Sequence, residues 1–195
     1  MFYHLDNFAN VEVGQKIAQG STIGTLGKTG LKVSEVSMGT WQLAGRPWGW
    51  DAPDEAESMR ALYRFTELGG NFVDTAWVYG RVDEPGDEKG AHCSEELIGE
   101  FIKETNCRDK VIIASKIPSL NRQWPLRAGI PIDQTFPDQY IEKIVDSSLK
   151  SLGIETLDLM QFHVWQDDYA QVDSWKNTIQ RITKAGKVKF WGISV

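Results

Sequence analysis

The stretch that decides the fold reads Asn71-Phe72-Val73-Asp74-Thr75-Ala76-Trp77-Val78-Tyr79-Gly80. Phe72 and Val73 predict a buried strand, the acid Asp74 ends it, and a loop carrying Tyr79 follows. An apolar strand that ends in groups able to exchange protons is typical of the carboxyl face of a parallel barrel. We therefore expect other strands to place partners for these residues at the same face.

Strands and amphipathic helices alternate through the rest of the chain. Apolar residues recur every three or four positions in the helical segments, whereas the strand segments are short apolar runs. This alternation predicts a parallel α/β architecture with five strands. The expected strands are residues 36–41, 72–74, 111–116, 157–163 and 187–195, and the expected helices begin near Asp51, Ser94, Pro137 and Val172, three of them ending at Gly69, Gly153 and Gly186.

Residues 1–30 have a different pattern, with apolar residues alternating with polar ones and glycines at short intervals. This pattern predicts small β-hairpins ahead of the α/β part. We therefore divide the chain into a β-hairpin extension, residues 1–24, and an α/β part, residues 25–195.

The composition excludes several classes of function. The net charge is -6, which disfavours a nucleic-acid surface because phosphate binding requires clustered Lys and Arg. No apolar run approaches the roughly 20 residues that span a bilayer, and no signal peptide is recognisable, so we expect a cytoplasmic protein. The His92-Cys93 pair has no second ligand pair in register, so no metal site is predicted. The chain also contains no G-x-G-x-x-G motif, which disfavours a Rossmann domain.

Titratable residues occur at the ends of three consecutive predicted strands. Asp74, Lys116 and His163 end these strands, and Tyr79 lies in the loop after the first. Each residue alone has an ordinary structural interpretation, such as an ion pair, a loop aromatic or a core histidine. Because parallel strands end at one face, all four could converge on a site.

The four side chains together suit the protonation of a carbonyl oxygen as a hydride arrives. A lysine ammonium near Tyr79 would lower the tyrosine pKa from its usual value of about 10. Asp74 would keep Lys116 charged and oriented, and His163 could donate a hydrogen bond to the substrate oxygen. These expectations rest on the residues alone.

Five segments of the chain, taken together, resemble the aldo-keto reductase family. The resemblance implies an eight-stranded (β/α)8 TIM barrel, an NADPH cofactor bound without a Rossmann motif, and a small carbonyl compound as substrate. It also implies that Tyr79 is the general acid, that Asp74 and Lys116 tune it, and that His163 orients the carbonyl. The segments are Leu26–Trp41, Asn71–Gly80, Ile113–Lys116, Gln161–His163 and Gly186–Ser194.

The same resemblance implies a set of cofactor-binding residues, and the chain departs from the family at one neighbouring position. A loop of Gly39, Thr40 and Trp41 would lie beside the nicotinamide, and Ser194 would reach its carboxamide. The resemblance assigns Asp74 to the cofactor-binding residues as well as to the catalytic ones. Many members of the family have Asn where this chain has Val195.

The family resemblance also predicts that this chain is truncated. Five strands give a partial barrel that lacks three of the eight strands and part of the cofactor site. We therefore expect weak NADPH binding or none. The alternative function is that of a non-catalytic or chimeric fragment that self-associates through its open sheet edge.

Residues 1–30 resemble the interior of a lysostaphin-type zinc endopeptidase domain, in which His4 would be the counterpart of a catalytic histidine. The zinc ligands of that family are absent, and one histidine cannot hold a catalytic zinc ion. No peptidase activity is therefore predicted, and the segment is interpreted as a remnant or a non-native extension.

Trp48, Trp50 and Trp124 are expected to border the substrate pocket, which favours an apolar or cyclic carbonyl compound. Equally, Trp48 and Trp50 could fill the mouth of the barrel.

Overall fold

The computed structural model describes residues 5–6, 22–43, 54–80 and 94–194. Its main feature is a five-stranded parallel sheet in the order β4-β5-β6-β7-β8, so each strand pairs with the next one along the chain. Consecutive parallel pairing is the arrangement of a barrel wall, and it confirms the predicted α/β class and partial (β/α)8 barrel. The strands are β4 (Met38–Gly39), β5 (Phe72–Asp74), β6 (Ile112–Ile117), β7 (Leu157–Phe162) and β8 (Val188–Ile193).

A separate antiparallel sheet precedes the parallel one and contains β1 (Leu5–Asp6), β2 (Thr22–Leu26) and β3 (Lys32–Ser34). The short 3-10 helix η1 (Gly27–Thr29) connects β2 to β3. Strand β2 runs across the predicted boundary between residues 24 and 25, so both sides of that boundary contribute to one sheet. The division into two domains remains a prediction.

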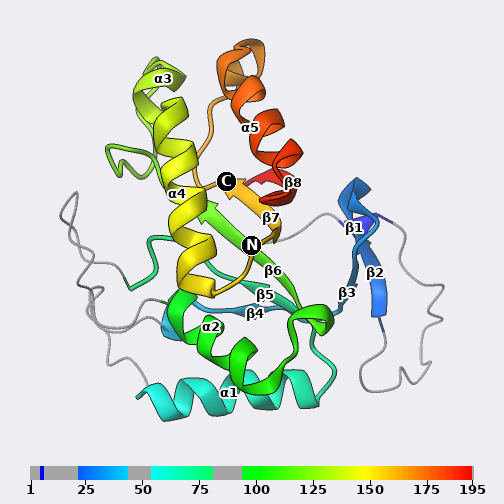
Figure 1. The fold of residues 1–195 in the computed structure, drawn as a ribbon. Helices are drawn as coiled ribbons and strands as arrows, with labels where there is room; N and C mark the ends of the chain where they lie inside the picture. Colours follow the sequence, from blue (N-terminus) through cyan, green and yellow to red (C-terminus); the bar gives the residue numbers. More distant parts are fainter. Residues whose placement is uncertain (1–4, 7–21, 44–53, 81–93, 195) are drawn as a thin grey trace.

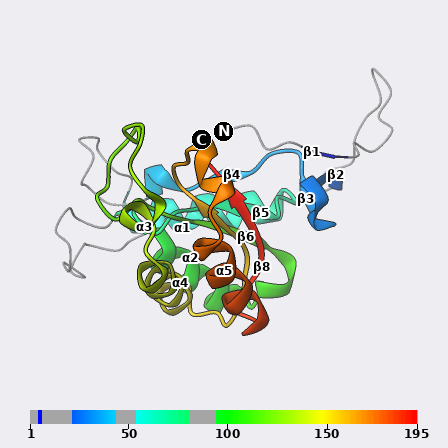
Figure 2. The ribbon, with the colours of Figure 1, turned by 90° about the horizontal axis from the view of Figure 1, so that it is seen from above.

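Helices cover one side of the parallel sheet, and the antiparallel sheet lies on the other side (Figures 1 and 2). None of the helices in the described part of the chain is long and apolar enough to cross a membrane. The α-helices are α1 (Glu55–Glu67), α2 (Ser94–Thr105), α3 (Ile132–Thr135), α4 (Asp138–Leu152) and α5 (Ser174–Lys184), and the further 3-10 helices are η2 (Trp41–Leu43), η3 (Arg108–Lys110) and η4 (Asp167–Gln171).

Local sequence accounts for where the helices begin and end. The Asp54 carboxylate accepts a hydrogen bond from the Glu57 backbone N–H at 2.7 Å and so caps α1. Pro137 precedes α4, and Gly153 ends it in the left-handed conformation with φ of 63°. The predicted position of α4 is therefore confirmed at both ends.

Two elements differ from the sequence-based expectation. Strand β4 contains only two residues because the chain turns into η2 directly after Thr40, whereas a strand over 36–41 was predicted. Helix α3 lies in a segment predicted to be a loop. Tertiary contacts hold it, since Ile132 and Thr135 are buried and the Thr135 hydroxyl forms a 2.9 Å hydrogen bond with the Tyr169 hydroxyl.

The larger hydrophobic core lies between the parallel sheet and the helices. Alternate strand residues, such as Ile113, Ile117, Met160 and Phe162, face this layer. Helices α2 and α4 approach closely because position 99 is glycine: a Cβ there would lie 2.7 Å from the Ser151 carbonyl oxygen. The other core residues of this layer come mainly from α2, α4 and the ends of β6 and β7.

A smaller core covers the opposite face of the parallel sheet. Leu26 and Val33 of the antiparallel sheet pack against Phe72, Ala114 and Leu159. The antiparallel sheet therefore closes the inner face near the amino ends of the strands.

Asn71 joins the two sheets where β5 begins. Its side-chain oxygen accepts a hydrogen bond from the Ser34 backbone N–H at 2.7 Å, and its amide nitrogen donates to the Lys32 carbonyl at 2.9 Å. The residue just before β5 is thus fixed to β3.

Asp158 connects three neighbouring strands near their amino ends. One carboxylate oxygen accepts hydrogen bonds from the Ile113 backbone N–H at 3.0 Å and from Arg108 at 2.9 Å. The other oxygen pairs with Lys189 at 2.7 Å. The Asp158 side chain is only 4% exposed, so this carboxylate depends on its three partners.

We expect Asp158→Ala to lower the free energy of unfolding by about 2 to 4 kcal/mol, because it leaves the buried Ile113 N–H without its acceptor and removes the carboxylate that pairs with Arg108 and Lys189. Urea unfolding followed by circular dichroism measures this change. The matched control is Asp173→Ala, which removes an ion pair whose aspartate is 82% exposed, and there the loss should stay below about 1 kcal/mol. Equal losses in the two variants would contradict the structural role given to Asp158.

Candidate active site

The structure brings together the three residues predicted at the strand ends and Tyr79, which was predicted in the loop after the first of these strands. Asp74 is the last residue of β5, Lys116 lies near the end of β6, and His163 follows β7 directly. Tyr79 lies in the turn after β5, where its backbone N–H donates to the Ala76 carbonyl at 3.0 Å. Parallel pairing aligns the carboxyl ends of the three strands, and the predicted convergence of these residues is therefore confirmed as geometry.

Lys116 and Asp74 form a buried ion pair. The Lys116 Nζ atom lies 2.7 Å from Asp74 Oδ1 and also donates to the Thr75 carbonyl oxygen at 2.8 Å. Lys116 is fully buried, and the Asp74 side chain is 12% exposed. Burial lowers the pKa of Lys116, and the Asp74 carboxylate acts in the opposite direction by favouring the charged ammonium.

The Tyr79 ring lies close to both Lys116 and His163. The Lys116 Nζ atom lies 5.2 Å from the centroid of the Tyr79 ring, and the His163 ring meets that ring edge to face at 5.9 Å. Burial and, to a smaller extent, the negative charge of Asp74 together raise the pKa of Tyr79 to about 12. The net shift of this pKa is therefore upward, opposite to the lowering expected from a nearby lysine ammonium, and its causes are burial and the charge of Asp74.

His163 is a neutral imidazole at physiological pH. Burial lowers its pKa to about 3, and the nearby positive charge of Lys116 lowers it as well. A neutral imidazole carries one N–H and can therefore donate a single hydrogen bond. This state fits the predicted role of His163 as a donor toward a substrate oxygen.

The polar atoms of Tyr79 and His163 form no side-chain hydrogen bond with other described residues. Trp41 lies 6.5 Å from the Tyr79 ring, and Trp124 lies 5.3 Å from the His163 ring, both distances being between centroids. Trp124 is 64% exposed, so it borders the site as expected, whereas Trp48 and Trp50 lie outside the described residues.

The residues predicted to bind the cofactor have different environments. Gly39 and Trp41 are exposed near the carboxyl ends of the strands, whereas Thr40 is fully buried. The Thr40 hydroxyl donates to the Asp74 carbonyl oxygen at 3.1 Å, so its side chain supports Asp74. Ser194 follows β8, is 2% exposed, and donates from its backbone N–H to Phe162 at 2.8 Å.

Sequence reasoning missed Gln161 as a polar group of this region. Gln161 is 3% exposed, and within the described part of the chain its Nε2 atom has no hydrogen-bond partner. Its side chain lies against Gly192, where a Cβ atom would come within 3.3 Å of it. The signal was present in the sequence, because residues two apart on a strand face the same side and Gln161 precedes His163 by two.

Ser94, Thr75 and Glu95 were also missed as parts of the site's support. Ser94 was predicted only as the start of a helix, although its hydroxyl contacts those of Thr40 and Thr75. Glu95 is fully buried and accepts a hydrogen bond from the Ser115 hydroxyl at 2.7 Å. No spacing rule in the sequence joins these residues, because their contacts form only when the strands pair and α2 packs on them.

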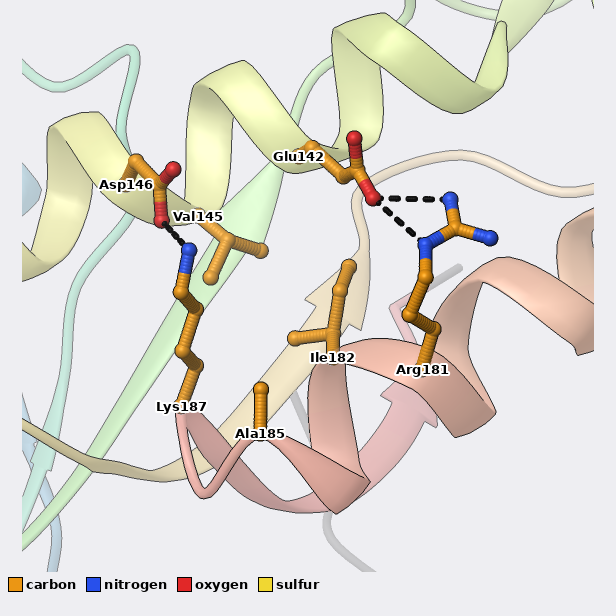
Figure 3. Close-up of a pocket in the computed structure, with 7 residues that line it drawn as sticks. All are labelled: Glu142, Val145, Asp146, Arg181, Ile182, Ala185 and Lys187. Carbon is orange, nitrogen blue, oxygen red and sulfur yellow. Dashed lines mark hydrogen bonds and ion pairs between the residues drawn. The ribbon is translucent and has the colours of Figure 1, made fainter.

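A cavity of about 140 Å³ lies elsewhere, between α4 and α5 (Figure 3). Its charged residues already pair with one another: Glu142 with Arg181 at 2.7 Å and Asp146 with Lys187 at 2.5 Å. The cavity is remote from the strand ends and offers no uncompensated charge. We therefore place the candidate active site at Tyr79 and not in this cavity.

The described residues contain no cluster of side chains suited to hold a metal ion. Cys107 is a buried free thiol. His4, His92 and Cys93, which the sequence analysis considered, lie outside the described residues.

Comparison with known proteins gives the same family over most of the chain. The model of the Aldo/keto reductase family matches residues 35–195. Aldo-keto reductase YhdN of Bacillus subtilis is 30% identical over 172 residues, which are 87% of this chain and 46% of the relative. An aryl-alcohol dehydrogenase [NADP(+)] of Phanerodontia chrysosporium is 28% identical over 170 residues, covering 85% of this chain and 41% of the relative.

A solved structure agrees with these sequence matches. A Pseudomonas aeruginosa protein described as an aldo-keto reductase superposes with a TM-score of 0.63 at 26% identity, covering 87% of this chain and 58% of that one. The chain spans about half the length of the curated relatives that it matches. The family model begins at residue 35 and so does not include residues 1–30, and the peptidase resemblance of that segment remains a prediction. The parallel sheet, the converging strand ends and these matches together show that the chain belongs to the aldo/keto reductase family.

Proposed function

We propose that the protein is an NADPH-dependent oxidoreductase that reduces an aldehyde or ketone to an alcohol, with Tyr79 as the general acid. The observation that carries this proposal is the buried Lys116–Asp74 ion pair beside Tyr79 and a neutral His163. Membership of the family supports the general class of reaction. The roles of the individual residues are the proposed part.

Tyr79 gives its phenolic proton to the carbonyl oxygen of the substrate. A general acid must hold its proton until the reaction needs it, and a Tyr79 pKa of about 12 keeps the phenol protonated at neutral pH. The alkoxide that develops on the substrate is a stronger base than a tyrosinate, so the proton still moves toward the substrate. The Lys116 ammonium stabilises the negative charge that appears on Tyr79.

His163 orients the substrate, and Asp74 orients Lys116. The neutral imidazole donates its single N–H to the carbonyl oxygen and does not compete with Tyr79 as an acid. Asp74 and the Thr75 carbonyl hold the ammonium below the Tyr79 ring. The site thus separates the proton donor from the groups that position the donor and the substrate.

Bound NADPH supplies the hydride for this reaction. Gly39, Trp41, Asp74 and Ser194 are the described residues that we assign to holding it, and Thr40 supports them through Asp74. The unpaired Gln161 Nε2 adds a buried donor that fits an oxygen acceptor on the cofactor. The aryl-alcohol relative is named for NADP(+), which supports this choice of cofactor.

We propose an apolar or cyclic carbonyl compound as substrate. The exposed Trp41 lies near Tyr79 and the exposed Trp124 lies near His163, and aromatic side chains at a site favour apolar or planar ligands. No nucleic-acid or membrane partner enters the proposal. A chelator-sensitive peptidase activity is not expected, because His4 lacks partner ligands in the sequence.

Self-association is a second candidate property of a chain of these 195 residues. Among the described strands, β8 pairs only with β7, and Ile193 at its end is 45% exposed. An unpaired strand edge offers backbone donors and acceptors to another chain. Such a fragment could persist by pairing through β8 without catalysing a reaction.

We expect Tyr79→Phe to abolish carbonyl-dependent oxidation of NADPH, because phenylalanine has no proton to give. Loss of absorbance at the nicotinamide band measures the rate with an aromatic aldehyde as the first substrate. The control is Tyr63→Phe, since the Tyr63 hydroxyl bonds Glu104 on the helical surface and should not affect the rate.

Titration of NADPH fluorescence belongs in the same experiment, and for the 195-residue chain we expect weak binding or none. Micromolar binding would contradict that expectation. A Tyr79→Phe variant that keeps the full rate would overturn the role of Tyr79, and a parent chain without activity would favour the non-catalytic alternative.

We expect His163 to make the protein less stable as the pH falls from 8 to 5. The unfolded histidine takes up a proton near pH 6.5, whereas the folded one, with a pKa of about 3, does not. Stability is therefore fully present above pH 6.5 and is lost below it, by up to about 2 kcal/mol at pH 5. Urea unfolding at both pH values should show a smaller loss in His163→Gln, and an equal loss would rule out a buried neutral His163.

We expect the purified chain to elute in size-exclusion chromatography at an apparent mass above that of a monomer. Ile193→Lys should shift it toward the monomer, because a lysine on an edge strand opposes pairing with another chain. The control is Val36→Lys, which changes an apolar residue that is 69% exposed but lies outside β8. Elution of the parent as a monomer at all concentrations would contradict the second candidate.

A further inference from the structure

Ser94 joins three parts of the candidate site that are far apart in the sequence. It is the first residue of α2, and its backbone N–H donates to the Tyr79 carbonyl oxygen at 3.0 Å. Its hydroxyl lies 2.6 Å from the Thr40 hydroxyl and 2.9 Å from the Thr75 hydroxyl. Ser94, Thr40 and Thr75 are all fully buried.

Counting hydrogens fixes the direction of this chain of hydroxyls. Each hydroxyl has one hydrogen to donate. Thr40 gives its hydrogen to the Asp74 carbonyl oxygen at 3.1 Å, and Ser94 gives its own to Thr40. Ser94 must therefore accept the hydrogen of Thr75, so the order runs from Thr75 through Ser94 and Thr40 to Asp74.

The two ends of the chain of hydroxyls lie at Asp74 and Thr75, the two residues that accept hydrogen bonds from Lys116. The Asp74 carboxylate and the Thr75 carbonyl both accept hydrogen bonds from the Lys116 ammonium. Asp74 and Thr75 are neighbours in the sequence, so the three hydroxyls form a ring around the end of β5. The Thr40 backbone N–H completes it by donating to the Asp74 carbonyl at 3.0 Å.

Removing the Ser94 hydroxyl would break two hydrogen bonds of this buried network. The Thr75 hydroxyl would lose its acceptor, and the Thr40 hydroxyl would lose its donor. Buried polar groups rarely stay unpaired, so either water enters or the end of β5 moves. Either change alters the surroundings of Tyr79, whose backbone the same serine holds.

We propose that Ser94 is a positioning residue for the reaction, because its hydroxyl and backbone N–H together fix Asp74, Thr75 and Tyr79 in one arrangement. The importance of this role for the rate rests on the proposed carbonyl-reductase function. The arrangement itself does not depend on that function. Ser94 touches neither the substrate nor the Tyr79 hydroxyl, so its effect is indirect.

Another serine provides a matched control. Ser148 in α4 is as deeply buried as Ser94, but its hydroxyl has no hydrogen-bond partner within the described residues. Ser148→Ala thus removes a buried hydroxyl without breaking a network. Any effect of Ser94→Ala that Ser148→Ala lacks is therefore due to the network.

The experiment follows Tyr79 directly by nuclear magnetic resonance of protein labelled with [13Cζ]tyrosine. Tyr79→Phe assigns the resonance, and the pH is raised from 8 to about 11, where an ordinary tyrosine with a pKa of about 10 is mostly ionised. Among the residues that the structure describes, Asp74, Lys116 and His163 are the charged or titratable groups that lie close to Tyr79. In the parent and in Ser148→Ala, the Tyr79 phenol should remain protonated across this range.

In Ser94→Ala we expect Tyr79 to begin titrating within this range, because water reaches a ring that the network no longer holds. Thr75→Val should behave in the same way, and Thr75→Ser, which keeps the hydroxyl, should behave like the parent. If Ser94→Ala fails to fold, the Thr75→Val and Thr75→Ser pair decides the question. A Tyr79 titration that is unchanged in the network variants, with only thermal stability reduced, would overturn the proposal.

Activity gives a second measurement in which the two proposals can be told apart. For an active parent, Ser94→Ala and Thr75→Val should lower kcat by about 10- to 100-fold while KM changes little, because a small misplacement of catalytic groups affects the transition state most. An inactive parent would refute the proposed function but leave the tyrosine titration as the test of positioning. An active parent with normal kcat in both network variants would refute positioning alone.

Discussion

The buried ion pair between Lys116 and Asp74 is the interaction on which the site depends. A charge removed from water is costly unless a partner and further hydrogen bonds compensate it. Here the ammonium has the Asp74 carboxylate at 2.7 Å and the Thr75 carbonyl at 2.8 Å. The pair joins the ends of β5 and β6. Burial is the main cause of the raised pKa of Tyr79 and of the lowered pKa of His163, and the charges of Asp74 and Lys116 act in the same directions on these two groups.

These shifts give Tyr79 and His163 distinct states at neutral pH. Tyr79 holds its proton and His163 carries no charge. In the function that we propose, Tyr79 acts as the acid, His163 donates a hydrogen bond, and the Lys116 ammonium stabilises the charge that appears on Tyr79.

The two layers of the fold support this arrangement from opposite sides. The helices bury one face of the parallel sheet in a large core, whereas Leu26 and Val33 of the antiparallel sheet cover the other face near the amino ends of the strands. The inner face near the carboxyl ends is thereby left to polar residues, including Lys116 and Gln161. The hydroxyls of Thr40, Ser94 and Thr75 then connect β4, β5 and α2 at the point where the site forms.

The sequence by itself determined the α/β class, the five strands, the ends of most helices and the four residues at the strand ends. Those features depend on local periodicity, on capping residues and on the rule that parallel strands end at one face. Only the tertiary structure decided the raised pKa of Tyr79, the exposed environment of Trp124, the two-residue length of β4 and the network through Ser94. Each of these depends on burial or on contacts between segments distant in the sequence, and neither can be read from the spacing of residues along one chain.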